Sequence, residues 1–201
     1  MCYSLHDGLE GVLWRAKNRA SGEWLRLPLA SLLWTFMSKH LSCVERAYGG
    51  AFDLRIAIPS HPDARGGVDH LQSVIDLVED FDSEWNTGAL VKSNSSKAGA
   101  RRSRIEADLF VADPMVSGKR ILLFDDTFTT GGTMASAAHA LKRGGARSVI
   151  GMAFGRQLKA DWPDSQEFVE FLSGRELNLE QCVVHSESKT HQVNPFFGSP
   201  R

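Results

Sequence analysis

The sequence has 201 residues, enough for one α/β domain with a small cap and for a core that needs no disulfide or metal ion. Its 23 lysines and arginines nearly balance 24 aspartates and glutamates, which argues against a protein that coats nucleic acid by charge alone. Hydrophobic residues make up 42% of the chain, so wholesale disorder is excluded as well.

The sequence carries no recognisable membrane or secretion pattern. No apolar stretch approaches the roughly 18 residues of a spanning helix, and the first residues lack the basic and apolar segments of a secretory signal. The three cysteines, Cys2, Cys43 and Cys182, are odd in number and far apart, which argues against a disulfide framework. We therefore expect a cytoplasmic protein with no membrane partner.

Apolar periodicity predicts helices and strands that alternate along the chain. Pro28 can occupy the first turn of the first long helix, where its missing N–H costs nothing. The expected helices cover 24–47, 68–78, 133–143 and a stretch around 166–172. The expected strands cover 54–58, 89–91, 109–111, 120–124 and 148–154. This alternation predicts an α/β fold, a mainly parallel sheet flanked by helices.

The most informative segment is 121–133, which reads Ile-Leu-Leu-Phe-Asp-Asp-Thr-Phe-Thr-Thr-Gly-Gly-Thr. A buried strand delivers Asp125 and Asp126 to the sheet edge where α/β proteins bind ligands. The small residues that follow open a helix, whose first backbone N–H groups suit a phosphate monoester. The predicted phosphate-binding residues are Thr129, Thr130, Gly131, Gly132 and Thr133.

The two carboxylates call for a different part of the ligand. Asp125 and Asp126 can accept hydrogen bonds from two vicinal hydroxyls, or hold a hydrated Mg²⁺. A ligand with a phosphate at one end and a diol a few ångströms away is a ribose 5-phosphate. The neutral alternative is that adjacent aspartates after a strand only cap the next helix.

This segment resembles the phosphoribosyl-diphosphate (PRPP) signature of type I phosphoribosyltransferases, with Thr127 in place of the usual aliphatic residue. Segments 58–66 and 101–109 resemble the ComF-like branch of that family, although Arg104 and Asp108 depart from its pattern. The four-cysteine zinc module with which many ComF-like proteins begin is missing, so zinc binding of that kind is not expected. The resemblance implies one domain over 1–201, with a core at about 9–156 and a small hood from the terminal segments, where 157–201 is a hood or tail.

The resemblance also implies roles for residues outside the signature. A turn would bind pyrophosphate, and a closing loop from about 93 to 104 would descend on it. The implied pyrophosphate-binding residues are Pro59, Ser60, His61 and Arg65. The implied catalytic residues of the loop are Lys97, Arg101 and Arg102, which act with Asp125 and Asp126. Mg²⁺ is the implied cofactor, and a homodimer is the common assembly of such enzymes.

The expected function is Mg²⁺-dependent transfer of phosphoribosyl from PRPP to a nucleobase or related nitrogen nucleophile. The alternative is a non-catalytic PRPP- or nucleotide-sensing module, with a regulatory role or one in DNA uptake. The basic run 97–104 has two other interpretations, a solvated face or a local nucleic-acid contact. Cys182, His185 and His191 could be metal ligands, but their spacing is loose and a fourth ligand is missing.

Overall fold

The computed structural model describes residues 2–4, 9–60, 69–78, 85–93, 104–158, 163, 166, 169–170, 178–182 and 184. Its elements, in chain order, are β1 (Cys2–Ser4), α1 (Leu9–Asn18), η1 (Ala20–Leu25), α2 (Arg26–Ala47), β2 (Leu54–Ala57), α3 (His70–Ile75), β3 (Leu90–Lys92), β4 (Phe110–Ala112), η4 (Pro114–Val116), β5 (Arg120–Phe128), α4 (Gly132–Arg143) and β6 (Ser148–Gln157). No described helix combines the length and apolar character needed to cross a bilayer.

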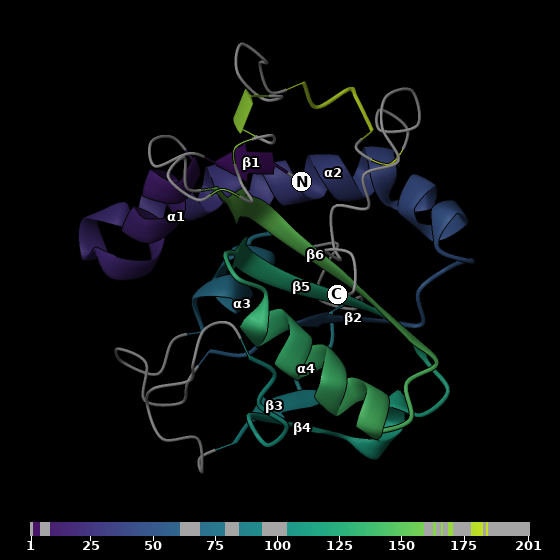
Figure 1. Cartoon of the computed structure of the whole chain (residues 1–201). Helices are drawn as coiled ribbons and strands as arrows, with labels where there is room; N and C mark the ends of the chain where they lie inside the picture. The colour runs from purple at the N-terminus through teal and green to yellow at the C-terminus, as the bar shows by residue number, and fades with distance from the viewer. Residues whose placement is uncertain are drawn as a thin grey trace.

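The centre of the fold is a four-stranded sheet in the order β1-β6-β5-β2, and every neighbouring pair in it is parallel (Figure 1). A separate two-stranded antiparallel ribbon is formed by β3 and β4. The predicted α/β fold with a mainly parallel sheet is therefore confirmed. The ribbon lies within one residue of the predicted strands 89–91 and 109–111, but it pairs outside the main sheet.

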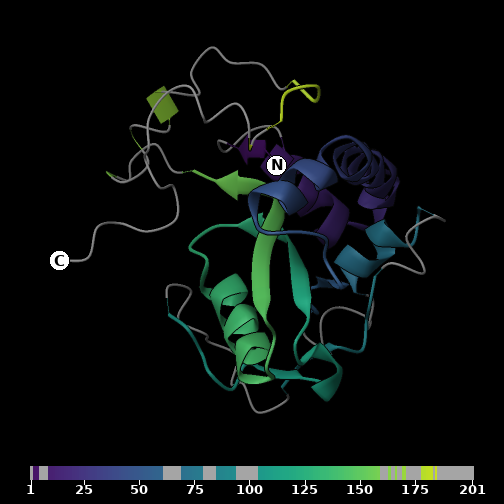
Figure 2. The same ribbon diagram turned by 90° about the vertical axis from the view of Figure 1, so that its right-hand side faces the viewer.

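Side chains of alternate residues of β5 pack into two hydrophobic cores, one on each face of the sheet. Leu122 and Phe124 pack with buried residues of α1, α2 and α3, whereas Ile121 and Leu123 pack with buried residues of α4 and the β3–β4 ribbon. Figure 2 shows α4 on one side of the sheet and α2 and α3 on the other. Each fully buried aliphatic or aromatic side chain contributes about 1.5–3 kcal/mol, so both faces must be covered for the strand to be stable.

The N-terminal segment forms a layer over one face of the sheet. Its helix α2 begins at Arg26, so Pro28 lies in the first turn as predicted, and the residues before it form the 3-10 helix η1. Part of the C-terminal segment also contacts α2, through an ion pair between Lys39 and Glu180 and a hydrogen bond between His40 and the Leu179 carbonyl. Part of the C-terminal segment therefore packs on the N-terminal segment at α2.

Two elements differ in length from the prediction. The strand β5 continues to Phe128 rather than ending at Phe124, because it pairs with β6 as far as Phe128 opposite Arg156. The helix α3 is shorter than the predicted 68–78, since Asp69 caps it and a turn follows Ile75. Within the expected helix around 166–172, the described positions 166, 169 and 170 are helical.

Candidate active site

The acid pair lies inside β5, where the strand keeps only one neighbour. The last residue of β2, Ala57, pairs with Phe124, so the strand on that side stops just before Asp125. On the other side Asp125 still pairs with Ala153 of β6. Because successive strand residues point to opposite faces, Asp125 shares the α4 face and Asp126 the α1 face. The two residues therefore leave the strand on opposite faces at a step in the sheet edge, but their side chains still interact directly there.

Lys17 of α1 neutralises Asp126. Its Nζ donates to Asp126 Oδ2 at 2.8 Å, and the Asp126 side chain is 16% exposed. Burial alone would lower the pKa of Lys17, but the charges of Asp126 and Asp125 outweigh it and raise that pKa above its ordinary value. Sequence reasoning missed Lys17, because its partner is 109 residues away and no local pattern marks the contact.

The carboxyl of Asp125 is held in an unfavourable place for a negative charge. Burial, and then the neighbouring charge of Asp126, raise its pKa to about 7, although the Asp126 backbone N–H donates to Asp125 Oδ1 at 2.8 Å. A nearby cation stabilises two adjacent carboxylates when one of them resists ionisation. Mg²⁺ prefers hard oxygen donors such as these as its ligands. The donor set of Asp125 and Asp126 therefore fits a magnesium ion.

The predicted phosphate loop joins β5 to α4 through a glycine that no other residue could replace without strain. Gly131, the residue before α4, has φ of 78°, and a Cβ there would lie 2.7 Å from Cζ of Phe128. Because this cap position is a glycine, no side chain caps the first turn that begins at Gly132. The N–H groups of that turn are therefore left to a ligand or solvent, with Thr130 before the turn and Thr133 within it.

Thr129 is held in place by the end of β6. Its Oγ1 donates to Gln157 Oε1 at 3.1 Å, and Gln157 Nε2 in turn donates to Glu10 of α1. This relay connects the start of the predicted phosphate loop to the N-terminal layer. Neither Gln157 nor Glu10 was singled out from the sequence, because each lies outside the motif.

The predicted pyrophosphate turn is tied down by a residue that was not predicted. The backbone N–H of Ser60, which follows Pro59, donates to Asp69 Oδ2 at 2.8 Å. The other oxygen, Asp69 Oδ1, accepts from the N–H groups of the first turn of α3. Asp69 thus fastens both ends of segment 61–68. An aspartate directly before an apolar-periodic stretch is a helix-start signal that could have revealed it. His61 and Arg65 lie outside the described residues.

The β3–β4 ribbon flanks the predicted closing loop. Below the loop, Ser93 N–H donates to the Leu109 carbonyl at 2.9 Å, and Glu106 N–H donates to Ser136 Oγ of α4 at 2.9 Å. Lys92 ends β3, and burial followed by the charge of Lys17 lowers its pKa despite the nearby Asp125. The predicted catalytic residues of the loop, Lys97, Arg101 and Arg102, lie outside the described residues.

A second unpredicted group faces the acid pair from α3. His70 is buried, and burial lowers the pKa of its imidazole although the charge of Asp126 opposes that shift. Its Nδ1 has no hydrogen-bond partner among the described residues. Together with Lys17 and Asp69, it gives the α1 side of β5 charged and polar groups that come from distant segments.

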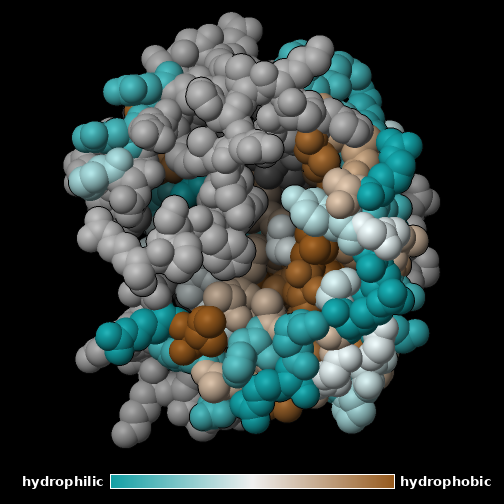
Figure 3. All heavy atoms as spheres, turned by 45° about the vertical axis from the view of Figure 1, so that its right-hand side comes forward, coloured by the Kyte–Doolittle hydropathy of each residue, from teal (hydrophilic) through white to brown (hydrophobic). Residues whose placement is uncertain are grey.

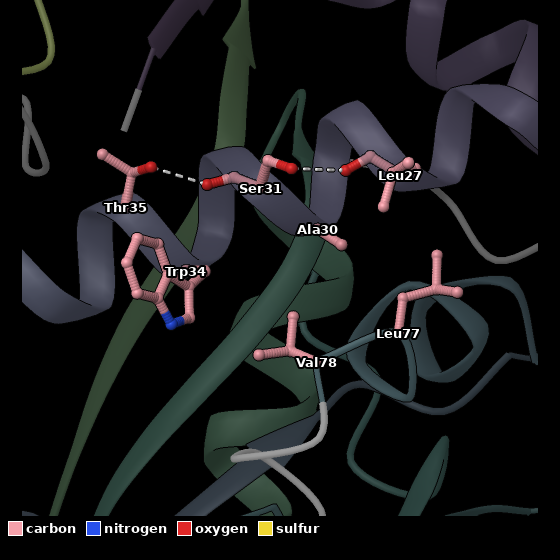
Figure 4. Close-up of a pocket in the computed structure, with 7 residues that line it drawn as sticks. All are labelled: Leu27, Ala30, Ser31, Trp34, Thr35, Leu77 and Val78. Atoms are coloured by element: carbon pink, nitrogen blue, oxygen red, sulfur yellow. Dashed lines mark hydrogen bonds between the residues drawn. The ribbon is translucent and has the colours of Figure 1, made fainter.

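A surface pocket of about 470 Å³ lies between α2 and the residues after α3, apart from the acid pair (Figure 4). It is lined by Leu27, Ala30, Ser31, Trp34, Thr35, Leu77 and Val78. The Ser31 hydroxyl donates to the Leu27 carbonyl and the Thr35 hydroxyl to the Ser31 carbonyl, so both hydroxyls in the lining already have partners within the helix. Figure 3 shows hydrophobic side chains gathered around a hollow on one face of the molecule, with polar side chains around them.

Residues 64–172, more than half of the chain, match the model of the phosphoribosyl transferase domain family. The protein therefore belongs to the phosphoribosyltransferase domain family. The match takes in Asp69, the acid pair and the phosphate loop, whereas Lys17 and Ser60 lie before it.

Among solved structures, the chain is similar to one described as the allosteric regulatory enzyme of purine biosynthesis. The identity is 18% and the TM-score 0.40, and the similarity covers 64% of this chain and 26% of that chain. This protein thus spans about a quarter of that chain's length. No curated protein matches the sequence.

Proposed function

We propose that this protein is a Mg²⁺-dependent phosphoribosyltransferase that binds PRPP and passes its phosphoribosyl group to a nitrogen nucleophile, releasing pyrophosphate. The observation that carries the proposal is the arrangement at the end of β5. The acid pair, with the pKa of Asp125 raised to about 7, directly precedes a helix start that no side chain caps. An acidic site next to a phosphate-binding site fits one ligand that carries both a diol and phosphates.

In this proposal the ligand lies across the step in the sheet. Thr129, Thr130 and Thr133, with the backbone at Gly131 and Gly132, would hold the 5-phosphate by hydroxyl and N–H donors. Asp125 and Asp126 would accept from the ribose hydroxyls or bind Mg²⁺ through its water shell. When bound, Mg²⁺ supplies charge that polarises the pyrophosphate oxygens and helps stabilise the leaving group.

The reaction would need little covalent chemistry from the protein. The anomeric C–O bond to pyrophosphate breaks, a C–N bond to the acceptor forms, and the proton on that nitrogen goes to solvent or a nearby base. The transition state is oxocarbenium-like, as in glycoside cleavage. The cationic loop residues Lys97, Arg101 and Arg102, with Arg65 and His61, would stabilise the departing pyrophosphate and exclude water.

The contacts within the protein indicate what ligand binding must displace. The Ser60 N–H, a candidate pyrophosphate donor beside Pro59, already donates to Asp69, which leaves the Ser60 hydroxyl for a ligand. Asp126 likewise already pairs with Lys17. Binding of Mg²⁺ and PRPP would exchange the Lys17 contact for contacts with the ligand, so the affinity depends on this competition.

The test is a screen for PRPP-dependent pyrophosphate release over purines, pyrimidines, their analogues and small amines, with and without Mg²⁺. The expected result is release with at least one acceptor, abolished in the Asp125→Ala/Asp126→Ala double variant. Asp76→Asn, which alters an exposed aspartate after α3, is the control and should retain activity. Absence of PRPP binding to the wild-type protein in calorimetry would overturn the proposal.

The Lys17–Asp126 ion pair also favours a second candidate, a non-catalytic module that senses PRPP or a nucleotide. A carboxylate that the protein neutralises with its own lysine has less need of a metal ion. This function predicts PRPP or nucleotide binding without turnover across the whole acceptor panel. Robust pyrophosphate release with any acceptor would exclude it. The regulatory or DNA-uptake role that the ComF-like resemblance implies belongs to this candidate.

A further inference from the structure

Three side chains with nitrogen and sulfur donors meet far from the acid pair. His40 and Cys43 lie one turn apart on α2, and Cys182 comes from the C-terminal segment 178–182. A ring nitrogen of His40 and the two sulfurs all lie within 4.8 Å of one another. His40 is buried and both cysteines are partly buried, and neither cysteine is in a disulfide.

The surroundings prepare these atoms to bind a metal ion. His40 Nε2 lies 2.7 Å from the Leu179 carbonyl oxygen, which can only accept, so Nε2 carries the proton. The lone pair of His40 is therefore on Nδ1. A backbone carbonyl that holds one ring nitrogen is the usual support of a histidine ligand. On the other side of the cluster, Arg46 donates to Cys43 Sγ at 3.5 Å, which orients this sulfur.

Contacts outside the cluster hold Cys182 against α2. Lys39, the neighbour of His40, forms an ion pair with Glu180, and Glu180 N–H donates to Asn178 Oδ1 at 2.9 Å within a turn. The turn between Asn178 and Cys182 is thus fastened to α2 at Leu179 and at Glu180. The approach of the three donors rests on these contacts as well as on the packing of the side chains.

We propose that His40, Cys43 and Cys182 bind a zinc ion, which links α2 to the C-terminal segment. Two thiolates and an imidazole are the donors that zinc prefers, and tetrahedral coordination brings such donors to about 3.5–3.8 Å from one another. The three donor atoms, which lie within 4.8 Å of one another, would move slightly closer to reach this separation. The fourth position belongs to water or to another side chain. In the sequence, His-x-x-Cys at 40–43 is followed by Cys-x-x-His at 182–185, and both have the spacing of zinc ligands.

The site differs from the sequence-based expectation, which grouped Cys182 with His185 and His191. The structure instead places Cys182 beside two residues of α2, while His185 and His191 lie outside the described residues. The proposed zinc site is independent of phosphoribosyl transfer, because it shares no residue with the acid pair or the phosphate loop.

The test uses the full-length protein, stripped of metal under reducing conditions and titrated with Co²⁺ as a spectroscopic probe and then with Zn²⁺. We expect one equivalent of Co²⁺ with a thiolate charge-transfer band and the visible bands of tetrahedral cobalt, displaced by Zn²⁺. Cys43→Ser and Cys182→Ser should each weaken zinc binding by at least about tenfold and diminish the charge-transfer band. Cys2→Ser and His139→Ala, which leave the cluster intact, are the controls and should bind zinc as the wild type does.

A second measurement avoids variants that fail to fold. In the wild-type protein, Zn²⁺ should protect Cys43 and Cys182 from alkylation, and a chelator should restore their labelling, while Cys2 should label equally in both states. Peptide mass spectrometry gives the labelling of each cysteine. The proposal is overturned if Zn²⁺ does not saturate a single site, or if alkylation of Cys43 and Cys182 is the same with and without Zn²⁺. A disulfide between Cys43 and Cys182 under these conditions would also overturn it.

Discussion

The two faces of β5 are built in different ways. On the α4 side, Asp125, the predicted phosphate loop and α4 are consecutive in sequence, so one short segment carries the predicted motif, although the β3–β4 ribbon also packs on that side. On the α1 side, Asp126 meets Lys17 from α1 and faces His70 from α3, which come from widely separated segments. The comparison teaches that a short motif can specify the residues proposed to bind phosphate and ribose, while distant segments balance the charge of the acid pair.

The largest expected effect is on the α4 side, from Gly131→Ala. A side chain at φ of 78° costs roughly 1–2 kcal/mol, and the overlap with the Phe128 ring adds about as much again. Gly118→Ala is the matched control, because Gly118 has φ of 73° and open space around a Cβ. Urea unfolding should show a larger loss of stability in Gly131→Ala, and PRPP binding should weaken only there. Equal losses in the two variants would show that the Phe128 contact does not matter.

On the α1 side, Asp69→Ala should lower the free energy of unfolding by about 2 kcal/mol. The aspartate accepts from three backbone N–H groups, two that start α3 and that of Ser60, and a lost helix cap alone costs about 1 kcal/mol. Asp113→Ala, which removes one such acceptor from the short helix η4, should lose about half as much. Equal losses would show that the bond to Ser60 contributes nothing.

The contribution of Asp125 to stability should be visible in the pH dependence of the free energy of unfolding. Its pKa is about 7 in the folded protein against an ordinary value of 3.8, so folding takes up a proton between those values. Stability from this group is therefore present below about pH 4 and is lost as the pH rises through 7. Without Mg²⁺, Asp125→Asn should gain stability relative to the wild type from pH 5 to pH 8, by about 1–3 kcal/mol. Urea unfolding at both pH values measures this difference. An equal stability difference between the variant and the wild type at pH 5 and pH 8 would contradict the prediction.

The smallest expected effect is on metal affinity. Because Lys17 competes for Asp126, Lys17→Ala should tighten binding of Mg²⁺ in the presence of PRPP by about 3- to 10-fold, within the range of a partly exposed ion pair. Arg15→Ala is the control, since Arg15 lies on the same helix and its side chain donates to the Gly11 carbonyl. Weaker Mg²⁺ binding in Lys17→Ala would instead show that Lys17 contacts the ligand. The α1 side of β5 would then take part in ligand binding rather than only balance charge.

The predictable part of the site is the part that is local in sequence. The strand before Asp125, the acid pair and the helix after Gly131 follow from hydrophobic pattern and turn chemistry, and the parallel sheet follows from the alternation of elements. The charge balance could not be predicted in this way, because Lys17 reaches Asp126 across 109 positions and Gln157 reaches Glu10 across 147. Such contacts depend on how α1 packs over the finished sheet.

The proposed zinc ligands illustrate the same limit. The spacing of His40 and Cys43 along one helix face can be seen in the sequence, but nothing in it says that Cys182 lies beside them. Only the packing of segment 178–182 on α2, held by Lys39 and Leu179, brings the three donors together.

Because β2 ends opposite Phe124, the part of β5 beyond Phe124 fixes the distance between the end of β2 and the predicted phosphate loop. Each strand residue advances the chain by about 3.3 Å, so the stretch beyond Phe124 sets how far the phosphate loop stands from the end of β2. Inserting one residue there would lengthen this span and also turn the carboxylate of Asp125 or Asp126 to the opposite face. Having threonine rather than an aliphatic residue at position 127 changes neither the length of this span nor the faces to which Asp125 and Asp126 point. The number of residues in this stretch is therefore under tighter physical constraint than the identity of residue 127.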